Sequence, residues 1–277
     1  MQNILFYIHR FRLEISLIYF KIKKNYSFKI KNRIFDVNPI HYKFWYKVKK
    51  NSWEKNNLLI FEKFINKDDE YLDIGAWIGP TLFQASLFTT NISCVEPDPI
   101  NFYYLKDNLK RSNLSKVISY HFPIIEEDRL VEFISSDKKG SSTAREIEKN
   151  EENHKYVLNG ITWQKFILGI SNKKFDFIKI DIEGAEYKLI LDIRDYVFKF
   201  KPTIYCSFHP FFNKKLHEEK ISEILEILSI YKFCYNENLI KIDINNYIFN
   251  FDGRKENSLI FSDKNIKNND RKSVGQL

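Results

Sequence analysis

The chain has 277 residues, enough for one large α/β domain with extensions or for two small domains. Its formal net charge is +8, but residues 1–50 hold 12 basic and only two acidic side chains, so the rest of the chain is close to neutral. This distribution argues against a uniformly basic nucleic-acid-binding protein and favours a near-neutral domain with a basic extension.

The three cysteines, Cys94, Cys206 and Cys234, lie far apart and form no CxxC pair, which argues against a zinc site and a disulfide framework. The N-terminus lacks the basic start and the small-residue cleavage site of a secretory signal. Its charge-free stretch, residues 1–8, is too short to cross a bilayer. The sequence therefore predicts a cytoplasmic protein, with a peripheral membrane contact left open by its first segment.

An apolar stripe runs along residues 4–22. Steps of four and three residues place six side chains on one face of a helix: Ile4, Ile8, Phe11, Ile15, Ile18 and Ile22. Basic residues flank the stripe, so one interpretation is a helix that lies on an anionic membrane surface. The alternatives are a helix that packs on its own domain and one that pairs with a second copy of the chain as a homodimer.

Residues 25–57 are rich in aromatic and basic side chains and show no clean period, so we expect an irregular cap or connector there. The tail beyond residue 262 is polar. These features divide the chain into a basic N-terminal extension over residues 1–57, a main domain over 58–262, and a flexible tail over 263–277.

The main domain alternates helix and strand patterns. Helices are predicted near residues 58–65, 80–87, 99–109, 161–168, 185–191 and 221–228, and strands at 71–74, 92–95, 117–122, 175–181, 203–208, 240–244 and 258–261. Two further extended pieces, 130–135 and 141–147, flank a turn at 137–140 and predict a hairpin. The alternation predicts an α/β fold with a doubly wound, mostly parallel sheet.

The turn after the first strand of this domain carries the first candidate site. Asp73 stands two residues before Gly75, and Gly79 follows four residues after it. A glycine at this turn lets a ligand approach the backbone, and the helix that follows offers free N–H groups. A GxGxxG dinucleotide motif is excluded because Trp77 and Pro80 stand where its further glycines would be.

Glu96 ends the second strand, 21 residues after Gly75. At the carboxyl edge of a doubly wound sheet, an acid in this place can accept both hydroxyls of a ribose. The joint spacing of the turn and this acid favours a nucleoside-binding site over an ordinary turn with solvated acids.

Three charged residues alternate onto one face of the strand at 175–181 and its continuation: Lys179, Asp181 and Glu183. Charges do not enter a sheet face without partners or a cleft, so they form either a self-contained ion cluster or a functional site. We favour function for the two acids and leave Lys179 open. His209 follows the next strand and reaches the same edge, where an imidazole can be a base, a metal ligand or a capping group.

Three blocks together resemble the FkbM-type S-adenosylmethionine-dependent methyltransferases. They are Tyr71–Gly79, Val95–Pro99 followed by Leu105 and Asn108, and Phe177–Glu186. The resemblance covers roughly residues 58–262 and implies a class I methyltransferase fold, a Rossmann-like sheet of seven strands whose last strand is antiparallel. It also implies S-adenosyl-L-methionine as the cofactor and O-methylation, often of sugar hydroxyls.

The resemblance also implies which residues bind the cofactor. The loop after the first strand would line its methionine end through Gly75, Ala76 and Gly79, with Asp73 supporting that loop. The remaining cofactor-binding positions follow the second and third strands: Glu96 at the ribose, Pro97 beside it, and Pro123 and Ile124 near the adenine. Trp77 departs from the family, which commonly has a small or amide residue at that position.

By the same resemblance, Asp181, Glu183 and His209 would face the methyl group and the acceptor. We expect Asp181 or His209 to take the proton of the acceptor hydroxyl, with Glu183 orienting its partner or the sugar. The three side chains could instead hold a divalent metal that lowers the pKa of the hydroxyl, but the primary prediction contains no metal.

The sequence therefore predicts an O-methyltransferase that acts on a small-molecule or glycan acceptor and has no nucleic-acid partner. One alternative is an RNA or DNA methyltransferase, which the basic, aromatic N-terminus encourages. It is disfavoured because Ile182-Glu183-Gly184 stands where base-methylating enzymes have a Pro-Pro-aromatic motif. The other alternative is a noncatalytic module with a cofactor-binding fold that acts through its N-terminal helix.

Overall fold

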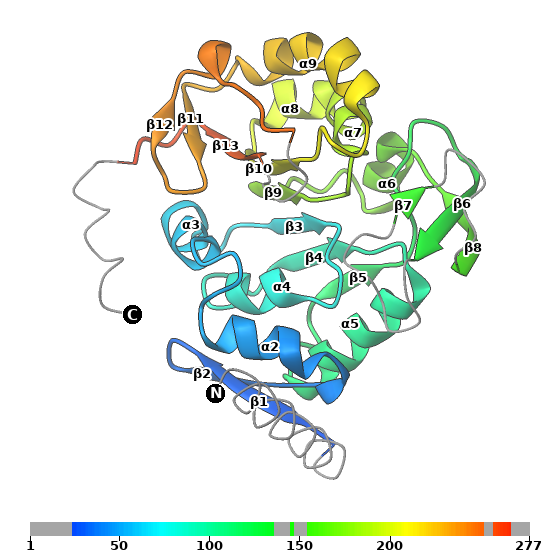
Figure 1. The fold of residues 1–277 in the computed structure, drawn as a ribbon, viewed down its shortest axis with the longest axis vertical. Helices are drawn as coiled ribbons and strands as arrows, with labels where there is room; N and C mark the ends of the chain where they lie inside the picture. Colours follow the sequence, from blue (N-terminus) through cyan, green and yellow to red (C-terminus); the bar gives the residue numbers. More distant parts are fainter. Residues whose placement is uncertain (1–23, 136–144, 147–153, 252–256, 267–277) are drawn as a thin grey trace, which may run out of the picture.

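The computed structural model describes residues 24–135, 145–146, 154–251 and 257–266, and Figure 1 shows their arrangement. The helix predicted over residues 4–22 and the turn predicted at 137–140 lie outside the described residues. Of the predicted tail, the structure describes the first four residues, where Ile266 is buried and its amide donates to the hydroxyl of Tyr235 at 2.9 Å. Within the described part of the chain, no helix is both long and apolar enough to cross a membrane.

The centre of the fold is an eight-stranded sheet with the order β12-β11-β13-β10-β9-β3-β4-β5. Five neighbouring strands are parallel: β3 (Tyr71–Ile74), β4 (Ile92–Val95), β5 (Ile118–Tyr120), β9 (Phe177–Ile180) and β10 (Thr203–Phe208). At the other side, β13 (Asn257–Ser262) runs antiparallel between β10 and β11 (Phe233–Asn236). The predicted doubly wound sheet with an antiparallel last strand is confirmed, and the two-residue β12 (Lys241–Ile242) adds an eighth strand at its edge.

Helices cover both faces of this sheet (Figure 1). One face carries α2 (Tyr42–Lys49), α3 (Asn57–Phe64), α4 (Pro80–Ala85) and α5 (Pro99–Arg111). The other carries α6 (Trp163–Gly169), α7 (Glu186–Asp192), α8 (Arg194–Phe200) and α9 (Lys214–Leu228). Side chains alternate across a strand, so Phe177 packs in the first of these two cores while Ile178 and Ile180 pack in the second.

Local sequence signals set where these helices begin. The carboxylate of Asp98 accepts hydrogen bonds from the amides of Ile100 and Asn101, both at 2.8 Å, and Pro99 takes the first position of α5. This is the predicted cap, since an aspartate satisfies amides that have no partner within the helix and a proline has no amide to satisfy.

Residues 25–57 form regular structure, so the expectation of an irregular connector is wrong. β1 (Tyr26–Ile30) and β2 (Arg33–Val37) form an antiparallel hairpin, followed by a 3-10 turn, η1 (Pro39–His41), and by α2. Phe28 stacks on Trp45 of α2 with ring centroids 5.4 Å apart, and both rings contact Phe83 of α4. The period-two burial of β1 spans only five residues among lysines, too short a pattern to stand out in the sequence.

Three other elements were not predicted: α8, β11 and β8 (His154–Gly160). β8 pairs with β6 (Arg129–Ser135), which also pairs with β7 (Arg145–Glu146), so the predicted hairpin is part of a three-stranded antiparallel sheet. The strand predicted at 240–244 shortens to β12, because a second 3-10 turn, η2 (Ile244–Asn246), begins at its end. Short elements such as these carry too few residues to show a period.

Candidate active site

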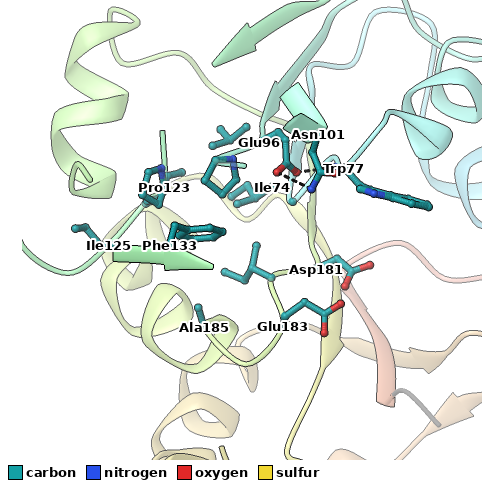
Figure 2. A pocket seen from close by; sticks show the side chains of 15 residues that line it. Ile74, Trp77, Glu96, Asn101, Pro123, Ile125, Phe133, Asp181, Glu183 and Ala185 are labelled. Carbon is teal, nitrogen blue, oxygen red and sulfur yellow. Dashed lines mark hydrogen bonds between the residues drawn. The ribbon is translucent and has the colours of Figure 1, made fainter. Parts of the chain in front are cut away.

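A pocket lies at the carboxyl ends of β3, β4 and β9, where doubly wound sheets bind their ligands. Figure 2 shows that apolar side chains occupy one side of it and the carboxylates of Asp181 and Glu183 the other, with Glu96 above and between them. The lining residues are Ile74, Gly75, Trp77, Val95, Glu96, Pro97, Asn101, Pro123, Ile124, Ile125, Phe133, Asp181, Ile182, Glu183 and Ala185.

Most of the site residues predicted from the sequence belong to this lining: Gly75, Glu96, Pro97, Pro123, Ile124, Asp181 and Glu183. The other four, Asp73, Ala76, Gly79 and His209, are placed behind the wall of the pocket, where they contact or adjoin residues that line it. The structure therefore brings the predicted cofactor and acceptor residues to one pocket, in two layers.

Asp73 supports the loop from behind. It is fully buried, and its Oδ2 accepts hydrogen bonds from the hydroxyl of Tyr71 at 3.0 Å and from the hydroxyl of Thr81 in the first turn of α4. Burial raises the pKa of Asp73, while the charge of Lys179 and these hydrogen bonds oppose the rise. This geometry fits the supporting role that the resemblance implies.

The glycines of the loop serve the packing of the chain itself. Gly75 has a φ of 91°, and a Cβ there would lie 1.9 Å from the backbone oxygen of Asp181. Gly79 has a φ of 95°, and its Cβ would lie 2.9 Å from Leu105 Cδ1. Glycine at 75 is thus required by the chain itself, because the loop after β3 packs against the backbone of Asp181, directly after β9.

Glu96 lies at the centre of the pocket wall and is only 4% exposed. Its Oε2 accepts the backbone amide of Trp77 at 2.7 Å, and its Oε1 accepts the amide of Asp98 at 2.9 Å and the side-chain amide of Asn101 at 3.4 Å. Burial raises the pKa of Glu96 to about 8, and these hydrogen bonds limit the rise. A carboxyl so placed is an acceptor whose protonation changes near neutral pH.

Trp77 lies in this loop with a φ of 49°. Its ring packs edge-on against Phe44 of α2 at a centroid distance of 4.4 Å, and a second edge-on contact joins it to His41. The N-terminal residues therefore provide the surface on which this large side chain rests. Sequence reasoning missed this contact, since the two segments are more than thirty residues apart.

A buried lysine lies beneath the acidic end of the pocket, which Asp181 and Glu183 form. Lys179 is 2% exposed, and its Nζ donates to Asp181 Oδ2 at 2.8 Å. Burial lowers the pKa of Lys179, but the carboxylates of Asp181 and Asp73 outweigh it and hold that pKa above its ordinary value. Lys179 is therefore an ion-pair partner of Asp181.

His209 approaches the same acids from the end of β10. Its Nε2 lies 3.7 Å from Asp181 Oδ1 and 4.0 Å from Glu183 Oε2. Burial lowers the pKa of His209, but the hydrogen bond and charge of Glu186, with the charges of Asp181 and Glu183, raise it to about 10. The predicted trio thus converges at one end of the pocket.

Sequence reasoning missed Glu186, which orients His209. This glutamate is fully buried in the first turn of α7, and its Oε1 accepts the backbone amide of His209 at 2.6 Å and faces His209 Nδ1 at 3.2 Å. Its Oε2 accepts the amide of Gly184 at 2.8 Å. Gly184 follows the strand with a φ of 101°, a conformation that favours glycine, and Glu186 stands two residues later. A glycine just after a strand, followed closely by an acid, is the sequence signal that could have identified Glu186.

Two comparisons of sequence bear on the family. A family model described as the methyltransferase FkbM domain matches residues 73–235, more than half of the chain. Comparison with curated proteins gives no significant match.

Solved structures with similar folds include the methyltransferase FkbM from Methylobacillus flagellatus KT, at 18% identity and a TM-score of 0.45 over 70% of this chain and 43% of that one. An O-methyltransferase from Bacillus cereus in complex with SAH has 12% identity and a TM-score of 0.42, over 75% and 77% of the two chains. A tRNA m1G37 methyltransferase from M. jannaschii has 13% identity and a TM-score of 0.38, over 86% and 53%. The chain spans less than half the length of the first of these, and none of these similarities selects a substrate.

The large, mostly parallel sheet, with its antiparallel strand β13 between β10 and β11, agrees with the class I methyltransferase fold that the resemblance implies. The pocket lies at the sheet edge where the three resembling blocks meet. With the family model matching from Asp73 to Tyr235, the chain belongs to the methyltransferase FkbM domain family.

Proposed function

We propose that the protein is an S-adenosyl-L-methionine-dependent methyltransferase that methylates a hydroxyl oxygen, in particular that of a sugar in a glycan or a related small molecule. The observation that carries the proposal is that a single pocket has Glu96 in its wall and Asp181 with Glu183 at one end. An acid at the end of β4 suits a ribose, and acids beyond the end of β9 suit a hydroxyl that must lose its proton. Membership of the family supports methyl transfer.

The residues of the pocket fit such a cofactor. Ile124, Ile125 and Phe133 give the apolar side on which an adenine would lie. Glu96 Oε2 accepts one hydrogen bond from Trp77, and a carboxylate oxygen has two lone pairs, so a ribose hydroxyl can be its second donor. The acidic end would then face the methionine part, whose sulfonium and amino group are positive.

When bound, the cofactor supplies an electrophilic methyl group on a sulfonium. Asp181 would hold the acceptor hydroxyl and take its proton as the hydroxyl oxygen is methylated. We assign the proton to Asp181 rather than His209 because the Asp181 side chain lines the pocket and is 20% exposed, whereas that of His209 lies behind it at 3%. Glu183 would orient the sugar.

The negative charge of Asp181 and Glu183 favours a sugar hydroxyl over a nucleic acid as the methyl acceptor. Carboxylates accept hydrogen bonds from hydroxyls but repel the phosphates of RNA and DNA. We therefore propose a small-molecule or glycan acceptor and no nucleic-acid partner.

A calorimetric titration with S-adenosylmethionine tests whether the protein binds the cofactor. An acceptor screen with a labelled methyl donor tests whether it transfers the methyl group, and to what. Asp181→Asn should lower turnover by roughly 100-fold or more, since it removes the proton acceptor. Asp128→Asn, which changes an exposed aspartate that pairs with Lys165, is the matched control and should leave turnover unchanged. Absence of cofactor binding would instead indicate the noncatalytic module, and labelling of RNA that survives moderate salt would indicate a nucleic-acid methyltransferase.

A further inference from the structure

Three side chains from two strand ends converge beside the pocket. Asp181 and Glu183 follow β9, and His209 follows β10. Each offers one ligand atom, and these three atoms all lie within 4.8 Å of one another. Figure 2 shows the carboxylates of Asp181 and Glu183 side by side at this end of the pocket.

The imidazole of His209 is fixed so that Nε2 faces the two carboxylates. Glu186 Oε1 lies 3.2 Å from Nδ1 and accepts the backbone amide of His209, and the residue is only 2% exposed. A carboxylate on one ring nitrogen of a histidine is the usual outer partner of a metal ligand, since it sets the orientation and basicity of the other nitrogen.

The distances around Nε2 suit a shared ion better than hydrogen bonds. Nε2 lies 3.7 Å from Asp181 Oδ1 and 4.0 Å from Glu183 Oε2, beyond the range of an N–H···O bond. Ligand atoms that each sit about 2.0–2.2 Å from one metal are separated by about 3–4 Å. The buried Nε2 of His209 therefore faces the two carboxylate oxygens at distances that a shared metal ion would produce.

We propose that Asp181, Glu183 and His209 form a binding site for a divalent cation. Two carboxylate oxygens and one imidazole nitrogen favour a transition-metal ion such as Mn²⁺ or Zn²⁺ over Ca²⁺, which takes oxygen ligands. Three carboxylates, those of Asp181, Glu183 and Glu186, surround the imidazole, whereas Lys179 adds one positive charge beside Asp181.

Three protein ligands leave coordination positions open, as in catalytic rather than structural metal sites. Asp181 and Glu183 also line the pocket, so these positions face the space where the acceptor would lie. The cation would bind the acceptor oxygen and make its hydroxyl more acidic, which eases loss of the proton to Asp181. This role rests on the proposed function, whereas binding of the cation does not.

The site can be tested with Mn²⁺ alone. The full chain, freed of metal by a chelator and dialysed, should broaden the electron paramagnetic resonance signal of Mn²⁺ saturably, with one ion per chain. His209→Gln and Asp181→Asn should abolish saturable binding, and Glu186→Gln should weaken it by roughly 10- to 100-fold, as loss of an outer partner does.

His217→Gln is the matched control. His217 is also a buried histidine, hydrogen-bonded to the hydroxyl of Tyr187 at 3.0 Å, but it lies outside the cluster, so Mn²⁺ binding should be kept. Circular dichroism would show that each variant is folded. Lack of saturable binding by the unchanged protein, or equal binding by His209→Gln and Asp181→Asn, overturns the proposal.

Titration of the same samples with S-adenosylmethionine separates this proposal from the proposed function. Cofactor binding without Mn²⁺ binding would remove the cation site and leave the methyltransferase standing. Mn²⁺ binding without cofactor binding would support the cation site and contradict the proposed methyltransferase function.

Discussion

The backbone amide of Trp77 donates to the carboxylate of Glu96 at 2.7 Å. This bond joins the loop after β3 to the end of β4, two segments that both line the pocket. Glu96 therefore has two tasks in the proposed function: it holds the loop in place and it accepts a ribose hydroxyl. The first three predictions concern this carboxyl.

At pH 9, Glu96→Gln should weaken S-adenosylmethionine binding by about 10- to 100-fold, the loss expected for hydrogen bonds to a charged group. The introduced amide would also turn an N–H toward the amide of Trp77 or Asp98, where only an acceptor fits. Isothermal titration calorimetry measures the change. Glu127→Gln, at an exposed position outside the pocket lining, should leave affinity unchanged, and equal affinity in the two variants would remove Glu96 from the cofactor site.

Cofactor affinity should increase as pH rises through about 8. Burial raises the pKa of Glu96 to about 8, so at pH 6.5 the group is protonated and at pH 9 it is the carboxylate that accepts best. Titrations of the unchanged protein and of Glu96→Gln across this range isolate the contribution of Glu96, because the amide does not titrate. Identical pH profiles would contradict the assignment.

The same carboxyl should make the folded protein less stable as pH rises from about 4.5 to about 8. A pKa that is raised on folding means that the folded state binds a proton which the unfolded chain has already released, so the associated stability is lost as pH passes through the folded pKa. Urea midpoints at pH 5, 7 and 9 measure this trend. The decrease between pH 5 and 9 should be smaller in Glu96→Gln.

Trp77→Ala and Trp77→Gly form a matched pair for the left-handed loop position. Both remove the indole that packs on Phe44, so both should lower the free energy of unfolding by a few kcal/mol. A φ of 49° is sterically unfavourable for a residue with a Cβ atom, such as alanine, but not for glycine. Trp77→Gly should therefore be more stable than Trp77→Ala by about 1 kcal/mol. Equal stability in chemical denaturation would mean that the backbone at residue 77 is not strained.

Removing residues 1–22 tests the predicted N-terminal helix, which lies outside the described residues. The cut keeps Lys24, whose carbonyl accepts a hydrogen bond from Arg111, so the main fold should be unaffected. We expect cofactor affinity to survive and self-association or binding to anionic vesicles to be lost, as measured by analytical ultracentrifugation and vesicle sedimentation. If neither property is present in the full chain, both the membrane and the homodimer interpretations are wrong.

Sequence patterns located the elements that position the site. The strands at 71–74, 92–95 and 203–208 have the predicted bounds, because apolar runs between turn signals mark buried parallel strands. Asp181, Glu183 and His209 meet as expected, since the carboxyl ends of parallel strands share one edge. Asp98 caps its helix as its place before Pro99 predicts.

What the sequence could not show depends on contacts between distant segments. The clash that requires glycine at 75 is with the backbone of Asp181, and the ring that covers Trp77 belongs to Phe44. The role of Glu186 depends on a reversal of the chain at Gly184 that aims one buried oxygen at His209. Periodicity describes which face of an element is apolar, but it carries no information on which element will cover it.

The contact between Trp77 and Phe44 also sets how far the chain can be shortened. The family match begins at Asp73, yet the indole that lines the pocket rests on a ring that lies 29 residues before that start. A chain that began near residue 58 would keep all three resembling blocks and lose the surface beneath Trp77. The large residue at 77 and the aromatic N-terminal segment are therefore a matched pair, and the main domain depends on a ring that lies outside the bounds predicted for it.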